Sequence, residues 1–267
     1  MAVELLTDLK GYWKLDESSG NAADASGNGN TLVNQNTTPF VAAKLNNGAD
    51  FERGSSQNFG ITDASQTGLD FTGDFTLSFW WKPESLVEGG FIEKDSGSGS
   101  NREYGLGFNG VTTVNLTIPG SDGNPPAGGP ATWTQTFVVT TWYHVLVTYT
   151  ISSGNGELFI NGSSLGTDTT GATAINSGTA PFEIGGNGTI SGYNDGVMDE
   201  VGAWARKLNA DEIAALYGSG TPPSYDTFTG AASGPANLKS LDTNLKANIK
   251  SINTNLIANV KTFDTNA

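Results

Sequence analysis

Apolar and polar residues alternate in short runs along this chain, and glycine, asparagine and aspartate separate the runs. The clearest run covers residues 75–82, FTLSFWWK, in which every second residue from Phe75 to Trp81 is apolar. Alternation with a period of two is typical of a β-strand. Because Trp80 falls on the opposite side from Trp81, we expect both faces of this strand to be covered, as in a two-layer sandwich.

The same pattern predicts further strands at residues 12–15, 49–51, 58–62, 91–94, 104–108, 113–118, 182–185 and 196–205. Residues 142–149 and 156–160 are expected to form a hairpin, and Asn161-Gly162 is typical of a second, tight turn. Residues 119–134 are rich in proline and glycine, so we expect a long loop there. The fold class predicted is all-β, an antiparallel two-sheet sandwich.

One short helix is predicted after the last strand, at residues 209–217. Asn209 is a suitable N-cap, Glu212 lies three residues into the first turn, and Gly218 ends the segment. Ile213 begins an apolar stripe that would face the sandwich.

The C-terminal part of the chain changes in composition. Residues 221–236 are rich in proline, glycine and alanine and are predicted to be a linker, and residues 237–267 repeat with a period of eleven. We favour strands over a helix in this tail, because asparagine, threonine, serine and aspartate are poor helix formers, although an eleven-residue period also suits a supercoiled helix. Its apolar residues are expected to drive self-association or anchoring: Leu241, Leu245, Ile249, Ile252, Leu256, Val260 and Phe263.

Composition excludes several classes of function. The chain of 267 residues contains no cysteine and one histidine, so disulfides, thiolate metal sites and histidine clusters are excluded. A formal net charge of −14 argues against nucleic acid or an anionic membrane as a partner. No apolar stretch approaches the ~20 residues of a membrane-spanning helix. The first fifteen residues also lack the pattern of a secretory signal.

Six segments, taken in order, resemble laminin-G-like, concanavalin-A-like jelly rolls. They are residues 12–17 (YWKLDE), 24–30 (DASGNGN), 75–80 (FTLSFW), 142–145 (WYHV), 158–162 (LFING) and 198–201 (MDEV). The resemblance covers residues 8–218 and places one jelly-roll domain at residues 1–220. It implies two curved antiparallel sheets that bind glycans or proteins. It also implies that the first and last of these segments lie together.

The resemblance also implies a calcium ion where the first long loop meets the last strand. Asp24, Asn28, Asn30 and Asp199 carry the oxygen ligands that calcium prefers and match these positions. The alternative is that these residues form turns by bonding to their own backbone.

Glycan binding needs exposed aromatic rings and polar groups on loops. Candidate ligand-binding residues are Arg102, Tyr104, Trp133, Tyr193, Asn194 and Asp195. The alternative is that they pack the loops onto the sandwich. We expect His144, Trp80, Trp81 and Trp142 to be core residues rather than site residues.

Relatives that hydrolyse polysaccharides carry Glu-x-Asp-x-x-Glu on one strand, and this motif is absent here. We therefore expect a non-catalytic protein that binds glycans or a cell surface. The alternatives are a hydrolase or lyase, with Glu93 and Glu103 as the carboxylate pair, and a structural scaffold that binds nothing.

The tail resembles phage and environmental virion proteins through its Lys-(Ser/Thr)-apolar-(Asn/Asp) repeats. Together with the missing signal pattern, this resemblance predicts a virion or extracellular assembly, such as a capsid decoration, a fibre or an adhesin component.

Overall fold

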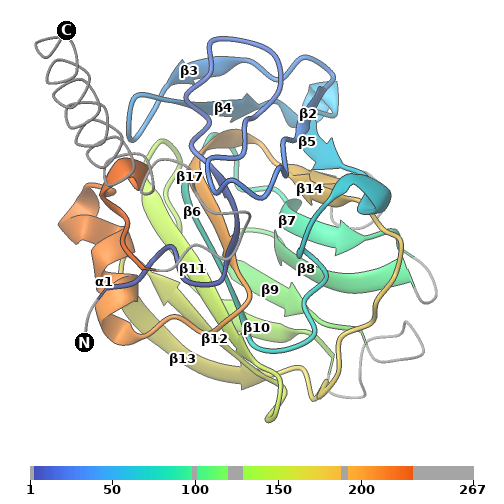
Figure 1. The fold of residues 1–267 in the computed structure, drawn as a ribbon. Helices are drawn as coiled ribbons and strands as arrows, with labels where there is room; N and C mark the ends of the chain where they lie inside the picture. The colour runs from blue at the N-terminus through green and yellow to red at the C-terminus, as the bar shows by residue number, and fades with distance from the viewer. Residues whose placement is uncertain (1–2, 98–100, 120–128, 188–191, 231–267) are drawn as a thin grey trace, which may run out of the picture.

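The computed structural model describes residues 3–97, 101–119, 129–187 and 192–230. Two antiparallel sheets stack face to face, and one short helix lies at one side beside the N-terminus (Figure 1). The predicted fold class, an all-β two-sheet sandwich with one short helix, is confirmed. The apolar residues of both sheets fill the space between them and form the main core.

The first sheet has eight strands and contains the strongest strand predicted from sequence. In spatial order its strands are β13 (Ser163–Thr169), β12 (Asn155–Ile160), β11 (Tyr143–Thr150), β6 (Phe75–Pro83), β17 (Gly196–Trp204), β4 (Asn47–Phe51) and β3 (Phe40–Ala42), with β1 (Leu9–Trp13) also paired to β17.

The second sheet has seven strands and carries the site described below. Its order is β10 (Ala131–Thr134), β9 (Thr113–Thr117), β8 (Arg102–Phe108), β7 (Gly89–Asp95), β14 (Phe182–Ile184), β5 (Asn58–Ile61) and β2 (Val33–Gln35). A two-stranded hairpin, β15 (Gly186–Asn187) with β16 (Gly192–Tyr193), lies next to β7.

The alternation in β6 places its side chains as predicted. Phe75, Leu77, Phe79 and Trp81 belong to the main core. Trp80 points the other way and is still only 2% exposed. It stacks on Tyr217, the last residue of the helix α1 (Ala210–Tyr217). Both faces of the strand are therefore covered, which is what a tryptophan on each face requires.

Both predicted hairpins form. β11 pairs antiparallel with β12, and β12 with β13. Asn161 and Gly162 link the second pair with φ values of 52° and 74°, so both residues adopt the left-handed conformation of a tight primed turn.

The first and last strands of the sandwich lie side by side. β1 pairs antiparallel with the second half of β17, with Leu9 opposite Trp204 and Trp13 opposite Val201. The first and last of the six segments of the resemblance therefore lie together, as expected.

The helix has the caps that its sequence predicts. Asn209 accepts hydrogen bonds from the amides of Asp211 and Glu212, and the Glu212 side chain accepts one from the Asn209 amide, which together form a capping box. Gly218 ends the helix with φ 56°.

Two boundaries differ from the sequence prediction. Residues 131–134, placed in the long loop, form β10 and pair with β9. The predicted linker starts too early, because Tyr225 and Phe228 are buried in a second apolar cluster with Tyr12 and Trp204. Residues 231–267, including the repeats and their seven apolar residues, lie outside the described part of the chain.

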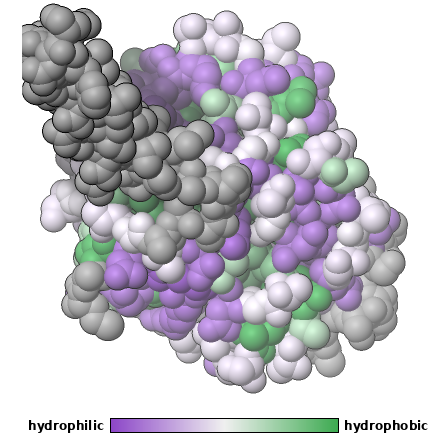
Figure 2. All heavy atoms as spheres, in the orientation of Figure 1, coloured by the Kyte–Doolittle hydropathy of each residue, from purple (hydrophilic) through white to green (hydrophobic). Residues whose placement is uncertain are grey.

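The surface of the molecule is mixed in polarity. Figure 2 shows small hydrophobic areas scattered among hydrophilic ones on the face in view. In the described ranges, no helix has both the length and the apolar character that crossing a bilayer requires.

Candidate functional site

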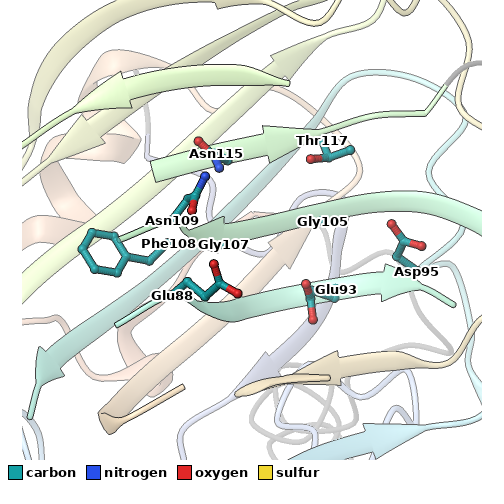
Figure 3. Close-up of a pocket in the computed structure, with 9 residues that line it drawn as sticks. All are labelled: Glu88, Glu93, Asp95, Gly105, Gly107, Phe108, Asn109, Asn115 and Thr117. Atoms are coloured by element: carbon teal, nitrogen blue, oxygen red, sulfur yellow. The ribbon is translucent and has the colours of Figure 1, made fainter. Parts of the chain in front are cut away.

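A hollow of about 210 Å³ opens on the outer face of the second sheet, over β7, β8 and β9 (Figure 3). Outward-facing residues of these strands line it, together with the core residue Phe108 and with two residues just outside the strands, Glu88 and Asn109. The lining residues are Glu88, Glu93, Asp95, Gly105, Gly107, Phe108, Asn109, Asn115 and Thr117.

The hollow exists because β8 has no side chains on its outer face at the central positions. Along YGLGF, Tyr104, Leu106 and Phe108 belong to the core, so Gly105 and Gly107 face outward. A Cβ on Gly105 would lie 3.8 Å from Cγ of Glu93, an ordinary contact distance. The two glycines thus form the floor of the hollow without any backbone strain at Gly105.

Acidic groups form one side of the hollow. Glu93 and Asp95 point to the same outer face of β7, as alternate residues of one strand do. The Glu93 carboxylate accepts a hydrogen bond of 2.8 Å from the amide of Asn187 in β15. Asp95 accepts 3.1 Å hydrogen bonds from Nε of Arg102 at both of its oxygens. Burial raises the pKa of Asp95.

Amide and hydroxyl groups form the other side. Asn115 and Thr117 project from β9, and Asn109 follows β8. The Oδ1 atom of Asn115 is buried and accepts no hydrogen bond from the residues that the structure describes. A buried acceptor without a donor is costly, so this atom favours a ligand that donates a hydrogen bond to it.

A second hollow lies on the same sheet, beyond the first. It has a volume of about 690 Å³ and is lined by parts of β2, β5 and β14, including Val33, Gly60 and Glu183. Glu183 stands directly opposite Glu93 in the pairing of β14 with β7. Burial raises the pKa of Glu183 to about 7, although Asn187 and Asn58 bond to its side chain and oppose this shift.

Three of the six predicted ligand-binding residues are buried, and for them the prediction of exposure is wrong. Tyr104 is 0% exposed and donates to the carbonyl of Leu69. Trp133 packs in the core and donates to the carbonyl of Gly166. Asn194 accepts a 3.0 Å hydrogen bond from the Trp81 indole. Tyr104 thus holds a loop onto the sandwich, Trp133 joins β10 to β13, and Asn194 is bound to β6. All three therefore have packing roles, which is the alternative given above.

The other three predicted residues are partly exposed but do not gather at one site. Arg102 pairs with Asp95 and so borders the first hollow. Tyr193 and Asp195 lie in the segment after β15, where Arg53 donates hydrogen bonds to the Tyr193 carbonyl and the Asp195 carboxylate. Only Arg102 therefore lies next to a lining residue through a side-chain contact.

The first loop is held by hydrogen bonds to its own backbone and to the backbone of β1. Both Asp24 oxygens are used, since the amides of Tyr12 and Ser26 donate to one and the amide of Asn30 to the other. Nδ2 of Asn28 donates to the carbonyls of Leu9 and Lys10.

The remaining two predicted calcium ligands are also engaged in backbone contacts. Nδ2 of Asn30 donates to the carbonyls of Lys10 and Thr67, and its Oδ1 accepts from the Thr67 amide. Asp199 accepts from the Leu45 amide. These contacts fit the turn-forming alternative, because the oxygens of Asp24 and Asn30 already have donors. Oδ1 of Asp199, in contrast, is buried and accepts no hydrogen bond from the described residues. The calcium ion therefore stays a prediction, and the proposed function does not depend on it.

A lysine occupies the centre of the main buried acidic group. Nζ of Lys94 lies 2.8 Å from Oδ1 of Asp63, 2.8 Å from Oδ1 of Asp70 and 2.7 Å from Oε1 of Glu103. It also donates to the carbonyl of Ala180. Burial raises the pKa of Glu103 to about 7, against the lowering effect of Lys94. Glu103 is thus bound to Lys94 and does not line the hollow with Glu93, so the pair suggested for catalysis does not form.

The single histidine has a structural place, as predicted. His144 is 1% exposed, its Nε2 lies 2.9 Å from the Ser78 hydroxyl, and burial lowers its pKa to about 3. It is therefore neutral in the folded protein at ordinary pH. Trp142, predicted to be a core residue, is only half-buried, and the Lys82 ammonium lies over its ring.

Sequence reasoning missed most of the hollow. Asp95, Asn115 and Thr117 were not singled out, although their outward positions follow from the same alternation that identified the strands. The glycines at alternate positions of residues 104–108 are the one local signal for an open strand face.

Comparison with known proteins is consistent with this fold. A family model described as "Concanavalin A-like lectin/glucanases superfamily" matches residues 53–214. Among curated proteins, the zebrafish (Danio rerio) protein "Adhesion G-protein coupled receptor V1" is 28% identical over 176 residues, 62% of this chain. The chain spans 3% of the length of that receptor.

Two solved structures share the fold at low sequence identity. One is domain 4 of the extracellular arabinanase AbnA from Geobacillus stearothermophilus, in complex with arabinotriose (16% identity, 78% of this chain and 98% of that one, TM-score 0.56). The other is the binding domain of Paraclostridial Mosquitocidal Protein 1 (15% identity, 79% of this chain and 52% of that one, TM-score 0.62). The family match ends before the C-terminal repeats, so their assignment stays a prediction.

Proposed function

The chain belongs to the concanavalin A-like lectin/glucanases superfamily, and we propose that it is a non-catalytic binding domain whose ligand occupies the hollow over β7, β8 and β9. The ligand class proposed is a glycan, such as a cell-surface polysaccharide. The observation that carries the proposal is the unsatisfied Oδ1 of Asn115 in a hollow with a glycine floor.

The chemistry of the lining supports a hydroxyl-rich ligand. The exposed Glu88 carboxylate can accept hydrogen bonds, and the Asn115 amide and the Thr117 hydroxyl can both accept and donate. Glu93 and Asp95, each 1% exposed, add negative charge below the surface. Several hydrogen-bonding groups converging on one concave site fix the orientation of a small ligand. Because Gly105 and Gly107 have no side chains, a sugar ring can approach the backbone of β8.

Filling the hollow tests the proposal. Gly105→Val puts a β-branched side chain on an outward strand position, where a Cβ makes only ordinary contacts, so the fold should be kept. We expect binding on a glycan array to be lost in this variant. Gly73→Val is the matched control, because nothing lies within 4 Å of a Cβ there and Gly73 does not line the hollow.

Equal glycan binding by wild type and Gly105→Val would place the ligand elsewhere and contradict the proposal. An array on which the wild type binds no glycan would support the alternative of a structural scaffold.

We also propose that the repeats at residues 237–267 join the domain to copies of itself or to a larger assembly, as in a virion decoration, a fibre or an adhesin component. The support is their eleven-residue period, since one such unit cannot bury its apolar side alone. The double variant Leu245→Asp with Ile252→Asp should reduce the mass measured by light scattering to that of a monomer. A wild-type monomer would contradict this role.

Polysaccharide hydrolysis is a second candidate, favoured by the position of Glu183 opposite Glu93. A raised pKa suits a general acid, and the second carboxylate would serve as its partner. Binding remains our first proposal because Glu93 is 1% exposed and Glu183 9% exposed, which leaves little room for a substrate to reach both. Release of reducing ends from a polysaccharide panel, abolished in Glu93→Gln, would reverse this order.

A further inference from the structure

We infer that the hollow over β7, β8 and β9 selects sugars by charge, and that its preferred ligand is an oligomer of an amino sugar with a free, positively charged amine. The inference rests on the proposed function and adds the class of glycan to it.

The charge of the lining is the first observation. Glu88, Glu93 and Asp95 all line the hollow, and none of its lining residues is a lysine or arginine. Glu88 is exposed, and its carboxylate has no ion-pair partner within the described ranges. Arg53 lies nearby, but its guanidinium donates to the main-chain carbonyl of Glu88 instead.

The cations that do lie close by are committed to other groups. Arg102 is bonded through Nε to both oxygens of Asp95, which offsets one of the three carboxylates. Lys94 is the neighbour of Glu93 and Asp95 in β7, but it points to the opposite face and is held by Glu103. A negative charge therefore remains on the hollow when its carboxylates are ionised.

The hydrogen-bonding pattern is the second observation, and it points the same way. The buried Oδ1 of Asn115 lacks a donor among the described residues, and the exposed Glu88 carboxylate on the acidic side of the hollow can also accept. An ammonium group brings three donors and no acceptor, so it suits such a site better than any other sugar substituent. A uronate would instead place a carboxylate against Glu88 and Glu93, and like charges at a binding site select strongly against a ligand.

Titration calorimetry with three matched ligands tests the inference. The full chain is titrated with oligomers of glucosamine, N-acetylglucosamine and galacturonic acid, all of one length and in a chelating buffer. Acetylation removes the charge of the amine and keeps the ring, so this pair isolates the charge effect. We expect the glucosamine oligomer to bind about tenfold tighter than the acetylated one, since a charged hydrogen bond is worth roughly that factor. Binding of the galacturonate oligomer should not be detected.

Two variants locate the effect. Glu88→Gln keeps the size of the side chain and removes one charge of the lining, so it should weaken glucosamine binding several-fold and weaken binding of the acetylated oligomer much less. Glu52→Gln removes the same charge from an exposed residue outside the lining and should change neither. Added salt should weaken binding of the glucosamine oligomer, because it screens the attraction.

Different results would contradict the charge selection and the proposed glycan binding. Equal affinity for the glucosamine and acetylated oligomers, or measurable binding of the galacturonate oligomer, would overturn the charge selection and leave a glycan-binding hollow in place. A wild-type protein that binds no glycan, on the array or in titration, would overturn both.

Discussion

At the scale of single residues, the most unusual feature is a fully buried lysine. The Lys94 side chain is 0% exposed, and its ammonium has four oxygen partners: three carboxylates and the carbonyl of Ala180. The partners come from loops at residues 63, 70 and 180 and from β8. Such an arrangement holds several segments together, because a buried charge left without partners is very costly.

Replacing Lys94 should therefore destabilise the domain strongly. Lys94→Met keeps most of the side-chain volume but leaves the carboxylates without their cation, and we expect a loss of about 3–5 kcal/mol in the free energy of unfolding. Urea denaturation measures this quantity. Lys207→Met is the control, since its exposed contact with Glu157, at 3.3 Å, should be worth less than about 1 kcal/mol. Equal losses in the two variants would contradict a structural role for Lys94.

Glu183 should make the stability depend on pH. Its pKa is about 7 in the folded protein and about 4.3 in an unfolded chain, so the folded state holds the proton more tightly. Its contribution to stability is complete below the unfolded pKa and is lost as the pH rises through the folded pKa.

Glu183→Gln removes this dependence and keeps the acceptor for Asn58. The variant should match wild type in thermal unfolding near pH 4 and exceed it at pH 8, by up to ~3 kcal/mol. The exposed Glu52→Gln serves as control. A difference between wild type and variant that is the same at both pH values would show that Glu183 does not titrate in this window.

At the scale of elements, the short helix depends on its caps. α1 has eight residues, and a helix of this length has little stability of its own. The capping box of Asn209 and Glu212 supplies partners for the first amides. Arg206 holds the Glu212 carboxylate with hydrogen bonds of 2.7 and 2.8 Å and also donates to the carbonyls of Thr7 and Glu4. The start of the helix thus fastens the N-terminal segment.

Removal of the cap should lower the stability of the whole domain. Asn209→Ala is expected to cost about 1 kcal/mol, because the amides of residues 211 and 212 lose their acceptor. Asn209→Asp keeps an acceptor and should stay close to wild type in the same denaturation experiment. If alanine and aspartate behave alike, the cap is not what stabilises the helix.

At the scale of the whole molecule, the two ends of the domain close on each other. Beyond the pairing of β1 with β17, Tyr12 contacts the rings of Tyr225 and Phe228, with centroids 5.1 Å away in both cases. The Leu6 amide donates to the carbonyl of Thr229. The domain therefore extends at least to residue 230, ten residues beyond the boundary predicted from composition.

Truncated chains test whether the folded domain ends at residue 220 or includes residues 221–230. A chain of residues 1–230 should unfold at the same urea concentration as a chain of residues 1–267. A chain of residues 1–220 loses the burial of Tyr225 and Phe228 and should be less stable by several kcal/mol, on the order of 3–5. Equal stability of residues 1–220 and 1–230 would support the shorter domain.

The prediction of strands succeeded where a local pattern carries the information. In β6 and β11 the alternation of side chains, the hairpin turns and the buried His144 all follow from residues next to one another in the chain. The same alternation predicts that Tyr104 is buried, because it shares the core side of its strand with Leu106 and Phe108. Its placement in an exposed binding site was wrong because the alternation puts its side chain on the core face of β8, whichever loop precedes the strand.

Only part of the candidate site could be predicted from the sequence. Alternation indicates that Glu93, Gly105 and Asn115 each lie on one face of a strand, but it does not indicate which strands are neighbours. The hollow depends on the order β7, β8, β9 and on the hairpin that brings Asn187 to Glu93. Such pairings join residues far apart in the chain, and local propensity carries no information about them.

The sequence by itself determined the class of fold, the period and turns of its strands, the caps of its helix and the exclusion of thiol and histidine-cluster chemistry. Tertiary structure alone decided which carboxylates meet. Glu103 and its aspartate neighbours surround Lys94 in the interior, while Glu93 meets Glu183 at the outer face. The physical reason is that the charge and solvation of a carboxylate depend on what strand pairing places within a few ångströms of it, and that distance is set by the whole fold.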